Sequence, residues 1–230
     1  MHKKIVTLAL GAAVAVASSG AFADDAGPND VRVGMYYVYF DSSATDISGP
    51  YVPSGLNLKV NSLETLYLAY VRSFSTHFKV ELAFGYPPLT KTVGSGPSTL
   101  GSVPYNGQTI ATARWLSPTL LAEYEFGDAN SRFRPYVGAG LNYTKFLARQ
   151  STAAGDAASG GPTSISLPAS LGPAATVGLS YAITDRWHVY ASYSAAIVDT
   201  KLTADTAGIL RTSQIQFNPM TLVVSAGYSF

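Results

Sequence analysis

Apolar and polar side chains alternate with a period of two residues along much of this sequence, most clearly between Pro118 and Phe146. Successive side chains point to opposite faces of a β-strand, so this segment predicts two antiparallel strands joined by a polar turn at residues 127–131. One face of each strand is apolar and ends in aromatic residues; its members are Leu120, Ala122, Tyr124, Phe126, Val137, Ala139, Leu141 and Tyr143. The alternation itself leaves open whether this face packs in a protein core or against lipid.

Similar segments recur along the chain and predict eight strands. They cover about residues 31–41, 62–73, 77–86, 112–126, 132–146, 170–183, 187–201 and 214–230. The connections after the first, third, fifth and seventh strands are long and rich in small and turn-forming residues, whereas the others are short turns. Alternate connections of a meander lie at opposite ends, and outer-membrane barrels combine an even strand number with short periplasmic turns and longer outside loops. The sequence therefore predicts an all-β fold, an eight-stranded antiparallel up-and-down transmembrane β-barrel with periplasmic termini.

The N-terminal 23 residues predict a secretory signal peptide. Lys3 and Lys4 form a basic start, residues 5–17 form an apolar run, and residues 21–23 read Ala-Phe-Ala, a small-x-small cleavage site. We expect cleavage before Asp24, which leaves residues 24–230 as the barrel domain. Beyond the signal, no apolar run approaches the roughly 18–20 residues that a spanning helix needs. The expected location is the outer membrane of a Gram-negative cell.

Composition favours lipid over water as the surroundings of the apolar faces. Hydrophobic residues make up 47% and charged residues only 13% of the chain, which also contains 15 Tyr. A soluble periplasmic β-sandwich would share the alternation but normally carries more surface charge. The formal charge of +1 falls to about −1 without Lys3 and Lys4, so there is no basic surface for nucleic acid. With no cysteine, disulfides and thiolate metal sites are excluded, and we expect no cofactor.

The last strand ends in Tyr228 and Phe230. A C-terminal Phe with an aromatic residue two positions before it resembles the signal that the outer-membrane barrel assembly machinery reads. The alternative interpretation is an ordinary aromatic strand end. With the signal peptide and the sorting of loops, we expect the assembly machinery to be a partner, together with outer-membrane lipid and lipopolysaccharide.

The segment Phe133-Arg134-Pro135-Tyr136-Val137-Gly138-Ala139-Gly140-Leu141-Asn142-Tyr143-Thr144 resembles the OmpW family of small outer-membrane channels. Weaker matches are residues 178–181, 198–200 and 227–230. The resemblance implies an eight-stranded barrel with a narrow apolar lumen that passes small hydrophobic molecules. Family members often have Trp near residues 170–172 and a large apolar residue where this chain has Ala83, so the smaller Leu171 and Ala83 imply a wider lumen or a different gate.

Strand register divides the expected lumen by height. Near the periplasmic end it places charged residues inside, namely Arg32, Lys79, Glu81, Glu123 and Glu125. We expect them to form a plug of ion pairs, because unpaired buried charge is costly; a proton or ion relay is the alternative. Above the plug the register places Phe40, Leu121 and Phe146 inside as an apolar cup, and the family resemblance implies that Ala83 and Leu171 line this cup as well.

Two prolines and one bulge affect this picture of the lumen. Simple alternation points Leu171 outward, and only a bulge at Gly172 and Pro173 would turn it into the lumen. We hypothesise that Pro118 and Pro173 interrupt the ladders near the outer rim, where a solute that met the plug could leave sideways into the membrane.

Two other classes of function remain as alternatives. A lipid-modifying barrel enzyme would need a nucleophile and a base near the lipid headgroups, but His77 and His188 lie beside short turns at the periplasmic rim. We therefore do not expect an enzyme. A recognition barrel would bind a partner through its long loops, which lack the Trp and Arg typical of such interfaces.

Overall fold

The computed structural model describes residues 27–40, 42–96, 99–100 and 103–230. The predicted signal peptide, residues 1–23, lies outside this part of the chain. No helix among the described residues is long and apolar enough to cross a membrane.

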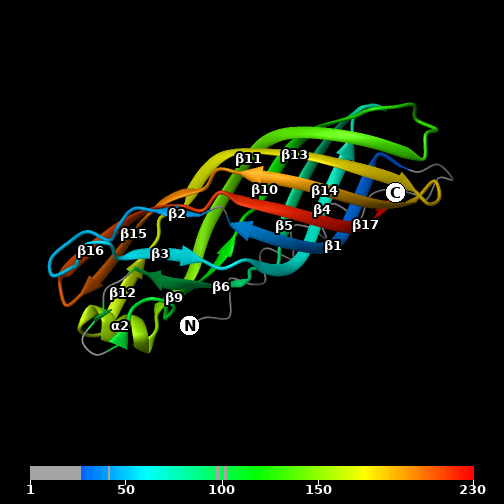
Figure 1. Cartoon of the computed structure of the whole chain (residues 1–230). Coiled ribbons are helices and arrows are strands. Elements are labelled where there is room, and N and C mark those ends of the chain that lie inside the picture. Colours follow the sequence, from blue (N-terminus) through cyan, green and yellow to red (C-terminus); the bar gives the residue numbers. More distant parts are fainter. Residues whose placement is uncertain (1–26, 41, 97–98, 101–102) are drawn as a thin grey trace, which may run out of the picture.

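Eight antiparallel strands close into a barrel, which confirms the predicted fold (Figure 1). In chain order they are β1 (Asn29–Phe40), β4 (Leu63–Ser73), β5 (Phe78–Gly85), β10 (Thr119–Glu125), β11 (Phe133–Ser151), β13 (Ser170–Ala182), β14 (Trp187–Ala196) and β17 (Pro219–Ser229). Each strand pairs with its neighbours in this order, and β17 pairs with β1 from Asp30↔Ser229 to Phe40↔Pro219. Closure leaves no exposed strand edge in this part of the sheet.

The short turns and the two ends of the described chain lie together at one end of the barrel. The amide of Ser73, at the first short turn, donates to the carbonyl of Pro28, and the amide of Ser229 donates to the carbonyl of Arg186 in the last short turn. The predicted sorting of connections is thus present in the structure. We refer to this as the short-turn end.

At the opposite end, the prediction that the long connections are irregular loops is wrong, because most of them contain regular secondary structure. They form an extension of short strands and one helix, which occupies the lower left of Figure 1. Its elements are β2 (Ser43–Ala44), β3 (Asn57–Val60), β6 (Leu89–Ser95), β7 (Thr99–Leu100), β8 (Val103–Pro104), β9 (Thr109–Leu116), α2 (Ala153–Ser159), β12 (Thr163–Ser166), β15 (Asp199–Thr206) and β16 (Ile209–Gln216). Strands β3, β6 and β9 continue the barrel sheet from β11, and β12, β15, β16 and β2 form a second sheet.

The hairpin of β15 and β16 shows why these strands were missed. It replaces the loop predicted at residues 202–213, and the last predicted strand begins at Pro219 rather than at residue 214. Ala207 and Gly208 have φ of 51° and 86°, the left-handed conformation that a two-residue hairpin turn requires. Polar and charged residues predominate in its strands, DTKLTADT and ILRTSQIQ, so they show little alternation of large apolar residues.

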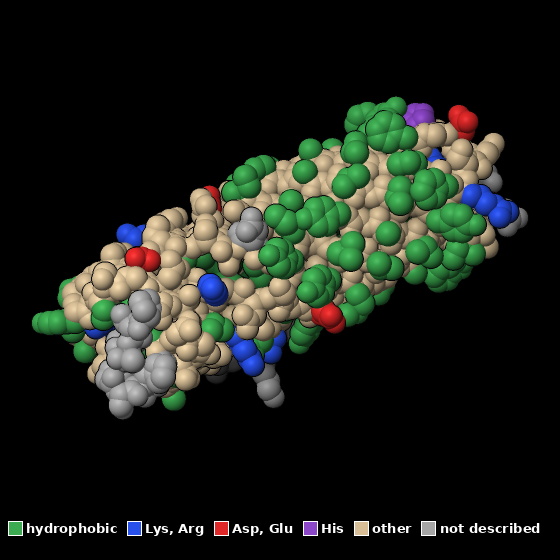
Figure 2. Space-filling model, viewed as in Figure 1, with side chains coloured by type: hydrophobic (Ala, Val, Ile, Leu, Met, Phe, Trp, Pro, Cys, Tyr) green, Lys and Arg blue, Asp and Glu red, His purple; other side chains and the backbone are tan. Residues whose placement is uncertain are grey.

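Large apolar side chains cover the outside of the barrel. They are denser over the barrel strands than over the extension in Figure 2. Leu120 of β10 and Leu141 of β11 are 51% and 55% exposed, as expected for side chains that face lipid rather than protein. Inside, polar side chains are buried toward the short-turn end, whereas an apolar core fills the other end and the extension. The barrel therefore has the predicted lipid face and a lumen that changes character along its axis.

Candidate functional site: stacked cavities above a charged plug

Three carboxylates surround Arg32 inside the barrel. Its Nη1 lies 2.5 Å from Glu81 Oε2, its Nε lies 3.2 Å from Asp30 Oδ2, and its Nη2 lies 3.6 Å from Glu123 Oε2. Arg32 and Glu123 are each only 1% exposed. Strands β5 and β10 are adjacent, and β4 separates them from β1. Inward positions of similar height on these strands bring the charges into contact across the narrow interior.

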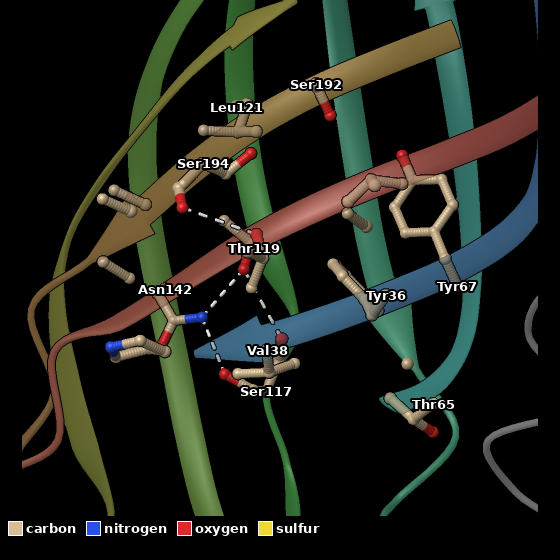
Figure 3. A pocket seen from close by; sticks show the side chains of 18 of the residues that line it. Tyr36, Val38, Thr65, Tyr67, Ser117, Thr119, Leu121, Asn142, Ser192 and Ser194 are labelled. Atoms are coloured by element: carbon tan, nitrogen blue, oxygen red, sulfur yellow. Dashed lines mark hydrogen bonds between the residues drawn. The ribbon is translucent and has the colours of Figure 1, made fainter. Parts of the chain in front are cut away.

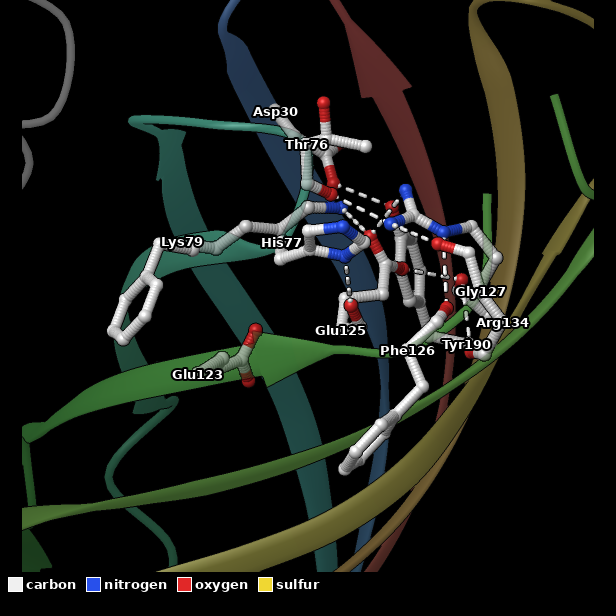
Figure 4. Close-up of polar contacts among 12 residues, drawn as sticks. Asp30, Thr76, His77, Lys79, Glu123, Glu125, Phe126, Gly127, Arg134 and Tyr190 are labelled. Atoms are coloured by element: carbon white, nitrogen blue, oxygen red, sulfur yellow. Dashed lines mark hydrogen bonds and ion pairs between the residues drawn. The ribbon is translucent and has the colours of Figure 1, made fainter. Parts of the chain in front are cut away.

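A second group of charges forms around Glu125. Its Oε2 lies 2.6 Å from Lys79 Nζ and 2.9 Å from Arg134 Nη1, while Ser180 Oγ donates to its Oε1 at 2.6 Å. Figure 4 shows Lys79, Glu125 and Arg134 converging from different strands, with the Asp30 and Tyr190 side chains nearby. Neither Asp30 nor Arg134 was predicted here from the sequence. The period of two that relates Asp30 to Arg32 was the available signal.

We call this set of side chains the charged plug: Asp30, Arg32, Lys79, Glu81, Glu123, Glu125 and Arg134. Aromatic residues complete its contacts. Tyr67 donates to Glu81 at 2.8 Å, Tyr190 donates to Asp30 at 2.7 Å, and the Arg32 guanidinium carbon lies 3.8 Å from the Tyr190 ring centre. An eight-stranded interior is just wide enough for side chains to fill it, so these groups occupy the lumen at the short-turn end.

A lower cavity of about 60 Å³ adjoins the plug, because Glu81 belongs to the plug and also lines the cavity. Figure 3 shows side chains that line this cavity. Tyr67 and Glu81 line it toward the plug, and Ala83 and Leu121 line its walls. Asn142 Nδ2 donates to Ser117 Oγ and Thr119 Oγ1, both at 2.8 Å. The Asn142 amide is therefore bonded to neighbouring hydroxyls that line the same cavity.

Two further cavities continue the line into the extension. A middle cavity of about 30 Å³ shares Trp115, Ser117 and Pro219 with the lower one. A tip cavity of about 80 Å³, inside the extension, shares Thr92 with the middle one. The cavities thus form a stacked series from the tip of the extension to the charged plug.

Aromatic rings narrow the lumen at the middle cavity. The ring centre of Phe217 lies 5.3 Å from that of Phe146 and 6.2 Å from that of Phe40, and Trp115 lies 6.2 Å from Phe40. The sequence pattern predicts Phe40 and Phe146 in the cup but not Trp115 or Phe217. These two residues lie in the extension strand β9 and just after β16.

The structure places four of the five predicted cup residues inside. Ala83 and Leu121 line the lower cavity, and Phe40 and Phe146 line the middle one. The placement of Leu171 in the lumen is wrong, because its side chain is 68% exposed on the outer face. The β11–β13 ladder runs without a shift from Phe133↔Tyr181 to Thr144↔Ser170, so no bulge at Gly172 and Pro173 turns Leu171 inward.

The barrel wall is discontinuous beside the lower cavity. The β5–β10 ladder ends at Ala83↔Thr119, and the β6–β9 ladder begins at Leu89↔Arg114. Among the described residues, no ladder pair joins residues 84–88 to residues 115–118, which contain Pro87, Pro88 and Pro118. Pro88 and Ser117 also line the lower cavity. We call this segment the wall gap. Pro173, in contrast, keeps its ladder position opposite Leu141.

The histidines and the C-terminal residues lie at the short-turn end. His77 Nδ1 is 2.9 Å from the Glu125 carbonyl, and its ring stacks on Tyr124 with centres 5.5 Å apart. Within the described ranges, no cluster of His, Cys, Asp and Glu is arranged to hold a metal ion. The ring of Tyr228 packs against that of Trp187, with ring centres 5.0 Å apart. The backbone amide of Phe230 donates to the carbonyl of Asn29.

The chain matches the model of the OmpW family over residues 25–230. It is 33% identical to outer membrane protein W of Escherichia coli over 228 residues, covering 99% of this chain and 100% of that protein. Its fold is similar to the crystal structure of the outer membrane protein OprG from Pseudomonas aeruginosa, with a TM-score of 0.78, 26% identity, and coverage of 90% of this chain and 97% of that one.

A partial relative is a dibenzothiophene metabolism operon protein, PahQ of Pseudomonas aeruginosa, with 31% identity over 52% of this chain and 53% of that protein. The family match covers nearly the whole barrel, including every strand that positions the plug and the cavities. This protein belongs to the OmpW family and is an outer-membrane β-barrel.

Proposed function

We propose that this protein is a channel for the passive uptake of small hydrophobic molecules across the outer leaflet. The observation that supports this most is the stacked series of cavities, which leads through the extension and the aromatic constriction to the lower cavity. The series ends on the charged plug, where further passage of an apolar solute would require displacing buried ion pairs.

The wall gap offers the solute a different exit. Residues 84–88 and 115–118 face each other without ladder hydrogen bonds, and the lower cavity touches both segments through Pro88 and Ser117. Opening the wall there costs no ladder pair, whereas opening it elsewhere would break several. An apolar molecule that left through the gap would enter the hydrocarbon layer that surrounds the barrel.

The relatives support the same proposal. The name of the partial relative PahQ places it in an operon for the metabolism of dibenzothiophene, an apolar aromatic compound. In our proposal the short-turn end and the termini are periplasmic, and the extension projects outward past lipopolysaccharide. We also propose that Tyr228 and Phe230 form the segment that the barrel assembly machinery reads.

Uptake into reconstituted vesicles tests the proposal. Vesicles that contain the protein and a trapped naphthalene-binding dye should report faster entry of naphthalene than protein-free vesicles. Entry of a hydrophilic solute of similar mass should match the protein-free rate, because the plug fills the lumen. Equal rates for naphthalene would contradict a channel and favour a recognition barrel, and a lipid product in the vesicles would indicate an enzyme.

A further inference from the structure

The tip cavity differs from the other two in the chemistry of its lining. Most of its wall is apolar, from residues such as Ile47, Val52, Leu56, Ile110 and Leu202. Tyr51, which is 85% exposed, lines it as well, and so do two less exposed polar side chains, Tyr105 and Arg211. Neither belongs to the charged plug, and passage of a purely apolar solute uses neither.

The Tyr105 hydroxyl is buried and has no hydrogen-bond partner among the residues that the structure describes. The side chain is only 4% exposed, and burial raises the pKa of this phenol above its usual range, so the group remains a neutral donor. The ring packs against the backbone of Gly94, where a Cβ would lie only 2.8 Å from its Cε1, so this glycine makes room for the ring. A buried donor in an apolar cavity is complementary to an acceptor on a ligand.

Arg211 adds a positive charge to the same cavity. Its Nη1 donates to the Ser159 carbonyl at 3.1 Å and to Thr206 Oγ1 at 3.3 Å, and its Nε donates to the Pro50 carbonyl at 3.2 Å. These acceptors are all neutral, and within the described part of the chain no carboxylate lies within 4.0 Å of its guanidinium. An anion is therefore the electrostatic complement of this cavity.

We propose that the tip cavity is a selectivity site for small apolar molecules that carry one carboxylate, with Tyr105 and Arg211 as its specificity-determining residues. A carboxylate can accept from the phenol and the guanidinium together, while its ring or chain contacts the apolar wall. The inference rests on the proposed channel function and narrows its substrate class. The site concentrates such acids at the outer end of the cavity series.

A matched pair of probes tests the site: 2-naphthoate and naphthalene share the same rings and differ by the carboxylate. Binding of each to the full chain in detergent is measured by the fluorescence of the probe. Wild-type protein should bind 2-naphthoate at least about tenfold more tightly than naphthalene, the ratio that a charge-assisted hydrogen bond provides. Tyr105→Phe removes only the unpartnered hydroxyl and should lower this ratio severalfold without changing naphthalene binding.

Control variants separate this inference from the channel proposal. Tyr39→Phe removes a hydroxyl on the outer face of β1, where the side chain is 51% exposed, and should leave both affinities unchanged. Arg211→Lys should retain part of the preference for 2-naphthoate, and Arg211→Gln should lose it. An unchanged affinity ratio in Tyr105→Phe overturns the selectivity site, as does equal binding of the two probes by wild-type protein. Absence of naphthalene flux in vesicles, with selective binding in detergent intact, would instead overturn the channel.

Discussion

The guanidinium of Arg32 lies over the ring of Tyr190, 3.8 Å from its centre, while the Tyr190 hydroxyl donates to Asp30, itself an ion-pair partner of Arg32. One aromatic side chain from β14 thus contacts both charges of a pair on β1. Such closed arrangements satisfy buried charges, and removing the cation leaves the carboxylates without compensation.

Arg32→Met should therefore destabilise the barrel strongly. The substitution leaves Asp30, Glu81 and Glu123 buried without their shared cation, which costs about 3–5 kcal/mol for a broken buried pair. Equilibrium unfolding by guanidinium in lipid vesicles measures the loss. Arg72→Met, at an exposed site near the short-turn end, is the control and should change the free energy of unfolding by less than about 1 kcal/mol. A cost as small as that of the control would show that the plug contributes little to stability.

Two of the three glutamates of the plug, Glu81 and Glu123, should respond differently to neutral substitution. Glu81 accepts from Tyr67 at 2.8 Å and pairs with Arg32 at 2.5 Å, so Glu81→Gln should cost about 1–3 kcal/mol. Glu123 lies 3.6 Å from Arg32, its oxygens accept no hydrogen bond from described residues, and carboxylates outnumber cations in the plug. Glu123→Gln should thus cost less than about 1 kcal/mol. The same unfolding assay compares them, and equal losses would contradict the unequal roles.

Filling the lower cavity should block uptake. Ala83 is 3% exposed and lines this cavity, so Ala83→Trp places an indole where a solute would pass, and naphthalene uptake should fall to the protein-free rate. Leu171→Trp is the matched control on the outer face, 68% exposed, and should leave uptake unchanged. As a control for folding, both variants must migrate in electrophoresis as folded barrels, like the wild-type protein. Blocked uptake in Leu171→Trp but not in Ala83→Trp would reverse the assignment of the lumen.

Closing the wall gap should slow release into the membrane. The triple substitution of Pro87, Pro88 and Pro118 by Thr supplies three backbone N–H donors. Because Thr is also favoured in β-strands, the facing segments can then extend their ladder. Hydrogen exchange of residues 84–88 and 115–118 should become slower, and naphthalene uptake should decrease while binding is retained. Slower exchange with unchanged uptake would indicate that the solute leaves by another route.

The sequence alone determined the barrel and the orientation of most of its side chains. Every residue of a closed, single-layer sheet faces either lipid or lumen, and its position along a period of two decides which. The outward faces of β10 and β11 and the inward placement of Glu123 and Leu121 followed directly from that alternation. The predicted placement of Leu171 in the lumen was wrong because it assumed a β-bulge in place of simple alternation. The β11–β13 ladder is regular at this position.

Only the tertiary structure decided which inward residues meet and what the long connections become. Alternation predicts that Arg32, Glu81 and Glu123 point inward, but the register between strands sets their positions along the barrel axis. The same register brings Asp30 and Arg134 into the plug. In strands such as β15 and β16 polar and charged residues predominate, so large apolar residues alternate little and the fold depends on pairing with distant segments. Those long-range pairings create the tip cavity, because its lining comes from connections far apart in the sequence that alternation within any one strand cannot relate.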